Sequence, residues 1–333
     1  MAAAARVTAP LLSLSGLTVR IGAATPVAGI DLRVDAGEVL GIVGESGSGK
    51  SLSLRAILRL LPAAAEVSGQ VSWQGRDLLA MPQEQLRRIR GREIAMIFQE
   101  PMTALNPVLP IGLQITESLR VHLGLRGAAA RRRAVELMEQ VGIPDSRRRL
   151  DNYPHEFSGG MRQRVMIAIA LAAGPKLLLA DEPTTALDVT IQDQILRLLL
   201  RLKDELGMAL VLVTHDLGVV AGTCDRVAVL YAGQVMESGP TASLFTRPAH
   251  AYTLGLLRSL PDAARARQRL EGIPGLPPDP LALPPGCRFS PRCAFVQPAC
   301  RVAPPPLLAV GAGHASACLR AGVVRQQALE HAA

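Results

Sequence analysis

Short, continuous apolar runs predict the buried strands of this chain. Three of them lie at Glu38–Val43, Lys176–Ala180 and Ala209–Val213. Runs without polar alternation are typical of parallel strands that are covered on both faces. Helical stretches are predicted over Leu52–Leu61 and Ile191–Leu206. Strands that alternate with helices in this way predict an α/β fold with a mostly parallel sheet.

The chain is expected to have two parts. Short apolar runs broken by Gly and Asp between Leu11 and Val34 predict small strands, and residues from about 100 to 165 are rich in Arg and Leu at helical spacing. After Pro240 the prolines cluster, and four of the five cysteines follow. We therefore expect an α/β domain over 11–240, with an inserted helical subdomain, and a loop-rich, cysteine-containing extension over 241–333.

Composition excludes membrane-spanning and disordered classes. Apolar residues make up 49% of the chain and charged residues 19%, which is typical of a globular protein. The longest apolar stretch, Val165–Ala180, is interrupted by Gly174, Pro175 and Lys176, so no run approaches the ~20 residues of a spanning helix. The segment before Leu12 lacks the apolar core of a signal peptide, and a cytosolic chain is expected.

The net charge of +8 raises the question of a nucleic-acid partner. Only three of the 36 basic residues are lysines, and the basic residues are scattered rather than gathered in a stripe. Aromatic residues account for 3% of the chain, too few for the stacking platforms that bind single strands. We therefore expect no nucleic acid as a partner.

A glycine-rich loop between a predicted strand and a predicted helix carries the strongest chemical signal. It matches the pattern G-x-x-x-x-G-K-[ST] with Gly44, Glu45, Ser46, Gly47, Ser48, Gly49, Lys50 and Ser51. Glycines let backbone N–H groups curl around phosphate oxygens, and the helix that follows favours negative charge. Lys50 is expected to bridge the β- and γ-phosphates of a nucleotide, and the Ser51 hydroxyl is expected to hold Mg²⁺.

Two carboxylates end the second apolar run. Asp181 follows Leu177–Ala180 directly, and Glu182 comes next. In a protein with a phosphate-binding loop, an acid at this place is expected to be a Mg²⁺ ligand. Glu182 is expected to accept a proton from the attacking water.

Further motifs identify a family. Phe157–Gln163 resembles the signature sequence of ABC-type ATPases, and Gln99 resembles the Q-loop glutamine of that family. Ala186–Asp188 resembles its D-loop, and Thr214–Asp216 resembles its switch-histidine loop. The motifs occur in the order of the family, and the resemblance covers roughly residues 11 to 240.

The resemblance implies that two such domains stack head to tail around ATP. Outside the phosphate loop it implies nucleotide-site roles for Gln99, Ser158, Gly159, Gly160, Asp181, Asp188 and His215. Ser158 and Gly160 would hold the γ-phosphate of ATP bound to the other subunit. Ser51 and Asp181 would hold Mg²⁺, and Gln99 would contact the same ion and sense its presence. The residues expected to carry hydrolysis are Lys50, Gln99, Glu182 and His215.

One position departs from the family. ABC-type ATPases usually stack adenine on an aromatic residue, whereas the matching stretch Thr18–Ile21 contains none. Ile21 offers a weaker apolar contact, so the affinity for the nucleotide and the selectivity for its base are open.

Four cysteines in the extension form a second candidate site. Cys287, Cys293, Cys300 and Cys318 are separated by five, six and seventeen residues. A disulfide framework is disfavoured in a cytosolic chain, and structural zinc sites mostly use shorter spacings. From the spacing alone, an iron–sulfur cluster, a zinc ion and free thiols all stay open.

A closer resemblance narrows these choices. Arg247–Leu257, Ile273–Gly275 and Gly286–Cys293 look like the C-terminal region of oligopeptide/dipeptide importer ATPases, and His155–Arg164 is similar as well. Met161 is typical of one of the two ATPase types of that family. The resemblance implies that the four cysteines ligate a [4Fe–4S] cluster. His314 is a competing ligand, and Cys224 is interpreted as an ordinary buried thiol.

The resemblance implies an ATPase subunit that drives uptake of di- and oligopeptides. It implies a second, related but non-identical ATPase subunit, two transmembrane permease subunits and an extracytoplasmic solute-binding protein. The chain would lie peripherally on the cytoplasmic face of the inner membrane. Nickel or another small solute is an alternative cargo. A soluble ABC ATPase that acts on DNA or ribosomes is disfavoured by the single phosphate loop and the lack of sustained heptads. A P-loop kinase or GTPase is disfavoured by the signature motif at Ser158 and by His215.

Overall fold

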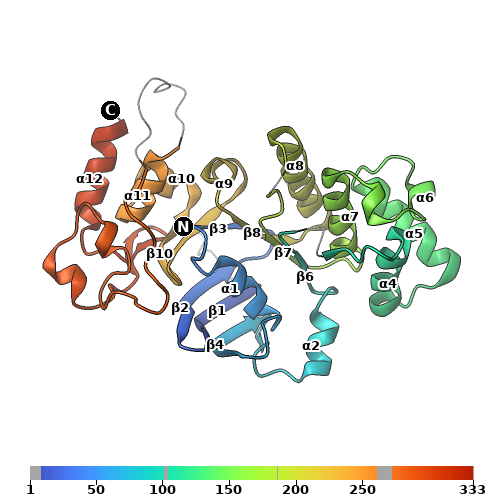
Figure 1. Cartoon of the computed structure of the whole chain (residues 1–333), viewed down its shortest axis with the longest axis horizontal. Coiled ribbons are helices and arrows are strands. Elements are labelled where there is room, and N and C mark those ends of the chain that lie inside the picture. The colour runs from blue at the N-terminus through green and yellow to red at the C-terminus, as the bar shows by residue number, and fades with distance from the viewer. Residues whose placement is uncertain (1–8, 101–103, 186, 261–271, 333) are drawn as a thin grey trace, which may run out of the picture. The chain divides into compact units, whose positions relative to one another are not determined.

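The computed structural model describes residues 9–100, 104–185, 187–260 and 272–332 (Figure 1). The chain divides into two compact units. The first comprises residues 1–35, 39–80 and 214–333, and the second comprises residues 36–38 and 81–213. Each unit is described separately below.

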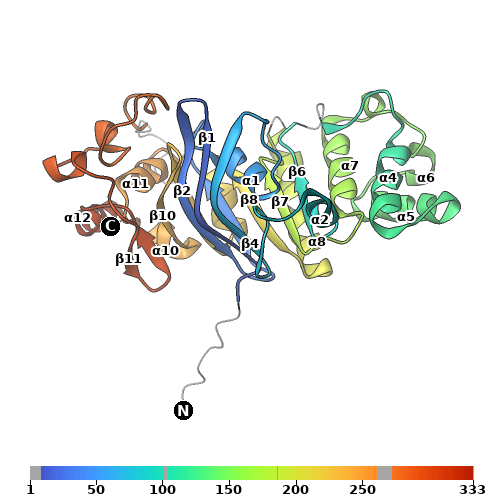
Figure 2. The same ribbon diagram turned by 90° about the horizontal axis from the view of Figure 1, so that it is seen from below.

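An antiparallel sheet forms one part of the first unit. Its strands are β1 (Leu12–Ile21), β2 (Ala24–Val34), β4 (Ala65–Trp73) and β5 (Arg76–Asp77), in the order β2-β1-β4-β5. Figure 2 shows β2, β1 and β4 side by side in the blue part of the chain. These are the small strands that the broken apolar runs predict.

The first unit also contains the predicted buried strand of the phosphate loop. Strand β3 (Val39–Val43) is buried along its whole length and pairs in parallel with β9 (Arg226–Tyr231). Strand β10 (Gln234–Pro240) runs antiparallel to β9. Helix α1 (Lys50–Ile57) follows the loop, and α9 (Leu217–Thr223) packs against β3. Because a parallel strand inside a sheet is covered on both faces, β3 consists of apolar residues and one glycine.

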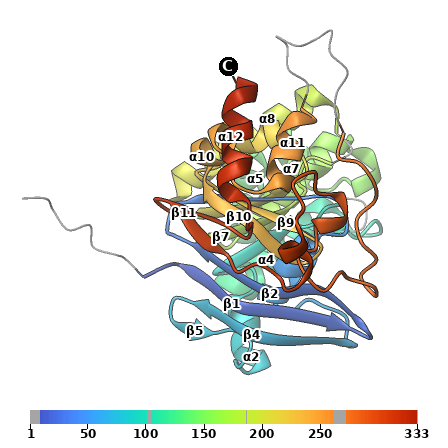
Figure 3. The ribbon, with the colours of Figure 1, turned by 90° about the vertical axis from the view of Figure 1, so that its left-hand side faces the viewer.

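The extension is less loop-rich than its prolines predict. Short 3₁₀ turns occur at Ser290–Arg292 and Pro298–Arg301. The regular elements are α10 (Thr241–Thr246), α11 (Ala251–Arg258), β11 (Leu308–Gly311), β12 (His314–Ser316) and α12 (Ala321–Ala332). Strand β12 pairs antiparallel with β10, and α11 packs against α12 and β10 (Figure 3). The extension is therefore part of the first unit, sharing its sheet in the order β11-β12-β10-β9-β3.

A buried carboxylate anchors the extension. Glu237, on β10, is fully buried and accepts hydrogen bonds from the backbone N–H groups of Ala249 (2.6 Å) and His250 (2.9 Å). Its carboxylate also lies 2.7 Å from Nε2 of His314. Burial lowers the pKa of His250 to about 4, while the charge of Glu237 acts in the opposite direction. The neutral His250 ring accepts from the Tyr252 N–H and thereby caps α11.

The second unit contains a parallel sheet and a group of helices. Its strands are β6 (Ile94–Ile97), β7 (Leu177–Asp181) and β8 (Ala209–Thr214), in the order β8-β7-β6. The helices are α2 (Gln83–Ile89), α4 (Ile111–Leu123), α5 (Gly127–Gln140), α6 (Ser146–Arg149), α7 (Gly159–Leu171) and α8 (Val189–Leu206), with a 3₁₀ turn at Pro154–Glu156. Helices α4, α5 and α7 pack against one another. This confirms the predicted helical insertion and the α/β fold class.

Among the described residues, no helix combines the length and the apolar character needed to cross a membrane.

Candidate nucleotide site and cysteine site

The phosphate loop joins β3 to α1, as the sequence predicts. Gly44 follows β3, and Gly49 is the N-cap of α1 with a φ of 99°. A Cβ on Gly44 would lie 2.1 Å from the carbonyl oxygen of Leu230, and one on Gly49 would lie 2.5 Å from that of Pro26. Both glycines are therefore required by close backbone approach, which keeps the loop tight around the start of the helix.

Lys50 and Ser51 occupy the first turn of α1. The Lys50 side chain is buried, and its Nζ donates to the carbonyl oxygens of Gly44 (2.8 Å) and Glu45 (2.9 Å). Ser51 is half-buried beside it, and the first turn contains no acidic residue. An ammonium group and a helix N-terminus at one loop favour a bound phosphate.

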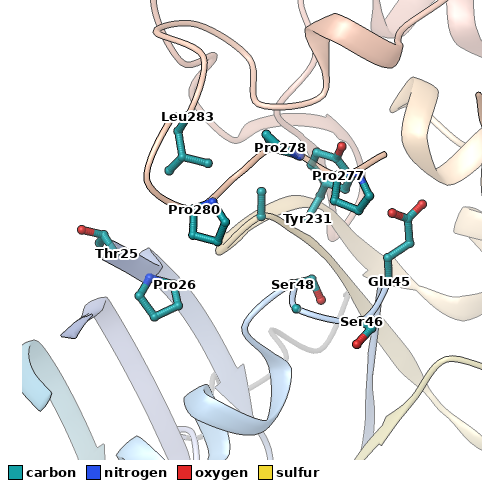
Figure 4. A pocket seen from close by; sticks show the side chains of 12 residues that line it. Thr25, Pro26, Glu45, Ser46, Ser48, Tyr231, Pro277, Pro278, Pro280 and Leu283 are labelled. Carbon is teal, nitrogen blue, oxygen red and sulfur yellow. The ribbon is translucent and has the colours of Figure 1, made fainter. Parts of the chain in front are cut away.

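A pocket of about 170 Å³ adjoins this loop within the first unit (Figure 4). The phosphate loop contributes residues 45–48 to it, and Thr25, Pro26 and Tyr231 form further walls. The remaining wall comes from the extension and consists of Pro277, Pro278, Pro280 and Leu283. The proline-rich segment therefore lies beside the phosphate loop, a placement that its composition did not predict.

The two predicted carboxylates lie at the end of β7 in the second unit. Asp181 is fully buried, and Glu182 has a left-handed backbone with a φ of 46°. The Glu182 carboxylate accepts from the Thr185 hydroxyl (2.8 Å) and from Nε2 of Gln99 (3.3 Å). The structure thus brings Gln99 and Glu182 together, and it stores backbone strain at Glu182, as is common at functional sites.

The signature motif and the D-loop each begin a helix. Ser158 is exposed at the N-cap of α7, where its hydroxyl accepts from the Met161 N–H (3.4 Å). Asp188 caps α8 by accepting from the Ile191 N–H (2.9 Å), whereas Ala186 lies outside the described residues. Gly159 and Gly160 form the first residues of α7, so their backbone N–H groups lie at a helix end that favours anions.

His215 follows the last residue of β8 and is exposed. The next residue, Asp216, caps α9 by accepting from the Gly218 N–H (2.7 Å). This cap fixes the direction in which the chain leaves the strand at His215.

The four cysteines of the extension line one cavity. They share it with the rings of Phe289 and Phe295, among other residues. Burial raises the pKa of Cys293 to about 11, and the charges of the other three cysteines add to the shift. Burial likewise raises the pKa of Cys287 and of Cys318. Four thiols from distant positions therefore lie close enough to influence one another electrostatically.

His314, the competing ligand, does not line this cavity, and neither does Cys224, the predicted buried thiol. His314 is held between Glu237 and the Arg325 guanidinium, with Nδ1 3.2 Å from Nη2. Cys224 is buried against β3, with its Sγ 2.9 Å from where a Cβ on Gly41 would lie, and burial raises its pKa to about 11. Its interpretation as a buried thiol fits this environment. Within the described residues, no group of three or more His, Cys, Asp and Glu side chains is placed so that it could hold a metal ion, so the predicted [4Fe–4S] cluster gains no support from this arrangement.

Three residues at these sites were not predicted. Thr185 hydrogen-bonds Glu182, and Arg292 and Tyr252 both contact Glu45 of the phosphate loop. Thr185 belongs to the stretch between Glu182 and the D-loop, so its position offered a local signal. Arg292 and Tyr252 belong to the stretches Gly286–Cys293 and Arg247–Leu257, which the resemblance marks. They lie 247 and 207 positions from Glu45, so their contacts with it could not be predicted from local spacing.

Two family models match successive stretches of this chain. Residues 27–185 match the ABC transporter family, and residues 236–300 match the oligopeptide/dipeptide transporter C-terminal region. A putative peptide import ATP-binding protein of Brucella abortus is 52% identical over 316 residues, covering 93% of this chain and 95% of the relative. A probable peptide ABC transporter ATP-binding protein of Sinorhizobium fredii is 53% identical over 302 residues, covering 89% of each.

Solved structures show the same fold. A dimeric ATP-binding cassette in a post-hydrolysis state with ADP and Pi superimposes with a TM-score of 0.60 at 31% identity, over 69% of this chain and 98% of that one. A subunit of the cbiONQ transporter complex from Clostridium perfringens gives 0.61 at 27% identity, over 72% of this chain and 91% of that one. These matches confirm the predicted ABC-type fold, ATP as the ligand and ATP hydrolysis as the activity. The chain belongs to the peptide-import ATP-binding proteins of the ABC transporter family.

Proposed function

We propose that this chain is the ATPase subunit that drives uptake of di- and oligopeptides through separate membrane subunits. The observation that carries the proposal is the combination, in one compact unit, of the phosphate loop with the oligopeptide/dipeptide transporter C-terminal region. The relatives named for peptide import span nearly the same length as this chain. Nickel chelates and other small solutes are the competing cargoes.

Phosphoryl transfer needs mainly positioning and charge neutralisation, and the site residues supply both. In the proposed mechanism Lys50 contacts the β- and γ-phosphates together with the N–H groups of the loop. The donors that would hold Mg²⁺ are the Ser51 hydroxyl, the Gln99 side chain and the buried Asp181 carboxylate, oxygen ligands of the kind this ion prefers. Bound Mg²⁺ would neutralise phosphate charge.

Glu182 is the proposed general base. The donors Thr185 and Gln99 both bond its Oε2, which restricts the rotation of the carboxylate. A carboxylate held in this way accepts a proton from water in a fixed direction. His215 would position the γ-phosphate and the attacking water.

Ser158 and Gly160 are proposed to hold the γ-phosphate of ATP bound to a second ATPase subunit, and Asp188 is proposed as a further residue of the nucleotide site. Ser158 and Asp188 are exposed at the N-termini of α7 and α8, which suits contact with another molecule. We propose a related, non-identical chain as that subunit. Two permease subunits and an extracytoplasmic solute-binding protein would complete a transporter, with this chain on the cytoplasmic face of the membrane.

Peptide-dependent ATP hydrolysis in the assembled transporter tests this proposal. We expect the hydrolysis rate in proteoliposomes with the permeases and the solute-binding protein to rise several-fold when short peptides are added. Substitution of Ser158 by arginine should abolish the rise, because it fills the space for the γ-phosphate. Stimulation by a nickel chelate but not by peptides would contradict the assigned cargo. Stimulation by DNA without membrane subunits would contradict the transporter role.

The four cysteines are proposed to ligate a [4Fe–4S] cluster. Support comes from the single cavity that they line. One thiolate per iron is the usual ligand set of such a cluster. A bound cluster would join the segments around residues 287, 293, 300 and 318.

Metal analysis after anaerobic purification tests the cluster. We expect about four iron and four sulfide per chain, with the broad visible absorption of a thiolate-bound cluster. Substitution of Cys293 by serine should lower both contents, whereas the matched substitution Cys224→Ser should leave them unchanged, because Cys224 does not line the cavity. Zinc alone, or no metal in the wild-type chain, would contradict the assignment.

A further inference from the structure

Arg292 connects the cysteine segment to the phosphate loop. It directly precedes Cys293, and its side chain is only 7% exposed. Its Nη1 donates to the carboxylate of Glu45 (2.8 Å) and to the Tyr231 hydroxyl (3.2 Å). Glu45 is the second residue of the phosphate loop, so a side chain from the extension forms an ion pair with the loop itself.

Aromatic rings and backbone carbonyl groups surround the Arg292 guanidinium and hold it in place for the ion pair with Glu45. The Arg292 guanidinium lies over the rings of Tyr231 (5.8 Å) and Phe289 (5.9 Å), which exclude water from one side. Two further donors are also used, because Nε bonds the Pro274 carbonyl (2.9 Å) and Nη2 bonds the Ile273 carbonyl (3.3 Å). A planar guanidinium that is bonded at each of its three nitrogens is held in one orientation toward Glu45.

Glu45 also contacts Lys50, the lysine of the phosphate loop. The Glu45 N–H donates to the Tyr252 hydroxyl on α11 (2.8 Å), so the extension holds both the side chain and the backbone of Glu45. The carbonyl oxygen of the same residue accepts from Lys50 Nζ (2.9 Å). A movement of Glu45 would therefore shift a partner of the ammonium group that binds phosphate.

We propose that Arg292 is a positioning residue for ATP binding, which acts through Glu45 to hold the phosphate loop in its binding conformation before the nucleotide arrives. The inference rests on the proposed function of the loop. A loop that is ordered in advance loses less conformational freedom when the ligand binds, so its affinity is higher. The extension thereby sets the affinity for ATP in addition to any role in transport.

The substitution Arg292→Gln tests the inference. We expect the affinity of the purified chain for ATP to fall by about tenfold, since truncating Arg292 leaves the partly buried Glu45 carboxylate without its ion-pair partner and frees the loop to move. In the assembled transporter the KM for ATP should rise more than kcat falls, because the reacting groups stay in place. Arg292→Lys should restore part of the affinity. Arg301→Gln, an exposed arginine of the same extension, is the matched control and should bind ATP like the wild type.

A double-mutant cycle with Glu45→Gln separates positioning from a general loss of structure. If Arg292 acts through Glu45, each single variant weakens ATP binding, and the double variant weakens it little further. Additive effects, or wild-type affinity in both single variants, would overturn the inference while the ATPase assignment stands. Failure of the wild-type chain to bind ATP would instead refute the proposed function. If circular dichroism shows that Arg292→Gln is unfolded, the affinity of Glu45→Gln for ATP tests the inference by itself. This variant keeps the bonds of Arg292 to its carbonyl partners, and wild-type affinity in it would overturn the inference.

Discussion

Replacement of Glu182 by glutamine is expected to stop ATP turnover while ATP still binds. Glutamine keeps the shape of the side chain and can still accept a hydrogen bond from Thr185, but it cannot take a proton from water. Loss of a general base lowers turnover by about a hundredfold to ten-thousandfold. The rate of phosphate release by the assembled transporter, compared with the Kd for ATP of the isolated chain, measures the two effects separately.

The matched control for this variant is Glu139→Gln. Glu139 is exposed on α5, and its replacement changes the net charge equally. It should turn over ATP at the wild-type rate. Normal turnover in Glu182→Gln would contradict the assignment of Glu182 as the general base. Loss of ATP binding in the same variant would show that the carboxylate contributes to binding of ATP and not to its hydrolysis.

Replacement of Lys50 by alanine is expected to remove most of the affinity for ATP. The ammonium group is the buried positive charge of the loop, held by the carbonyl oxygens of Gly44 and Glu45. A hydrogen bond to a charged group contributes about 1.5 to 3 kcal/mol, so the affinity should fall by roughly tenfold to a hundredfold. Calorimetric titration of the purified chain with MgATP measures the change.

Lys176→Ala is the control for Lys50→Ala, since Lys176 is exposed and its replacement removes the same charge. Its Kd for ATP should match that of the wild type. Because Lys50 also bonds two loop carbonyls, the melting temperature of each variant has to be compared as well. A folded Lys50→Ala variant with wild-type affinity would contradict the role of the lysine in phosphate binding.

Local features of the sequence predict the parts of the site that are built from neighbouring residues. The apolar run before Gly44 and the glycines of the loop predict a strand, a tight turn and a helix start, and the structure has all three. The run before Asp181 likewise predicts a buried strand that ends in carboxylates. Burial of a strand requires apolar residues, and close backbone approach requires glycine. Both requirements can therefore be recognised in the sequence.

The contacts between distant residues could not be predicted in this way. Arg292 is one of many arginines in an Arg-rich chain, and nothing in its neighbourhood relates it to Glu45. The pairing of β12 with β10, which makes the extension part of the first unit, involves a strand of only three residues between turns. Short strands of this kind are stabilised by their partner and not by their own sequence pattern.

The sequence by itself determined which chemical groups this protein contains: a phosphate loop, two carboxylates after a buried strand, a signature motif and four cysteines, each recognisable from residue type and position in the chain. Only the tertiary structure decided which of these groups meet. It joined Gln99 to Glu182, gathered the four cysteines around one cavity and set Arg292 against the phosphate loop. The physical reason is that such contacts depend on how the strands pair and the side chains pack across hundreds of positions, whereas motifs depend only on local backbone geometry and chemistry.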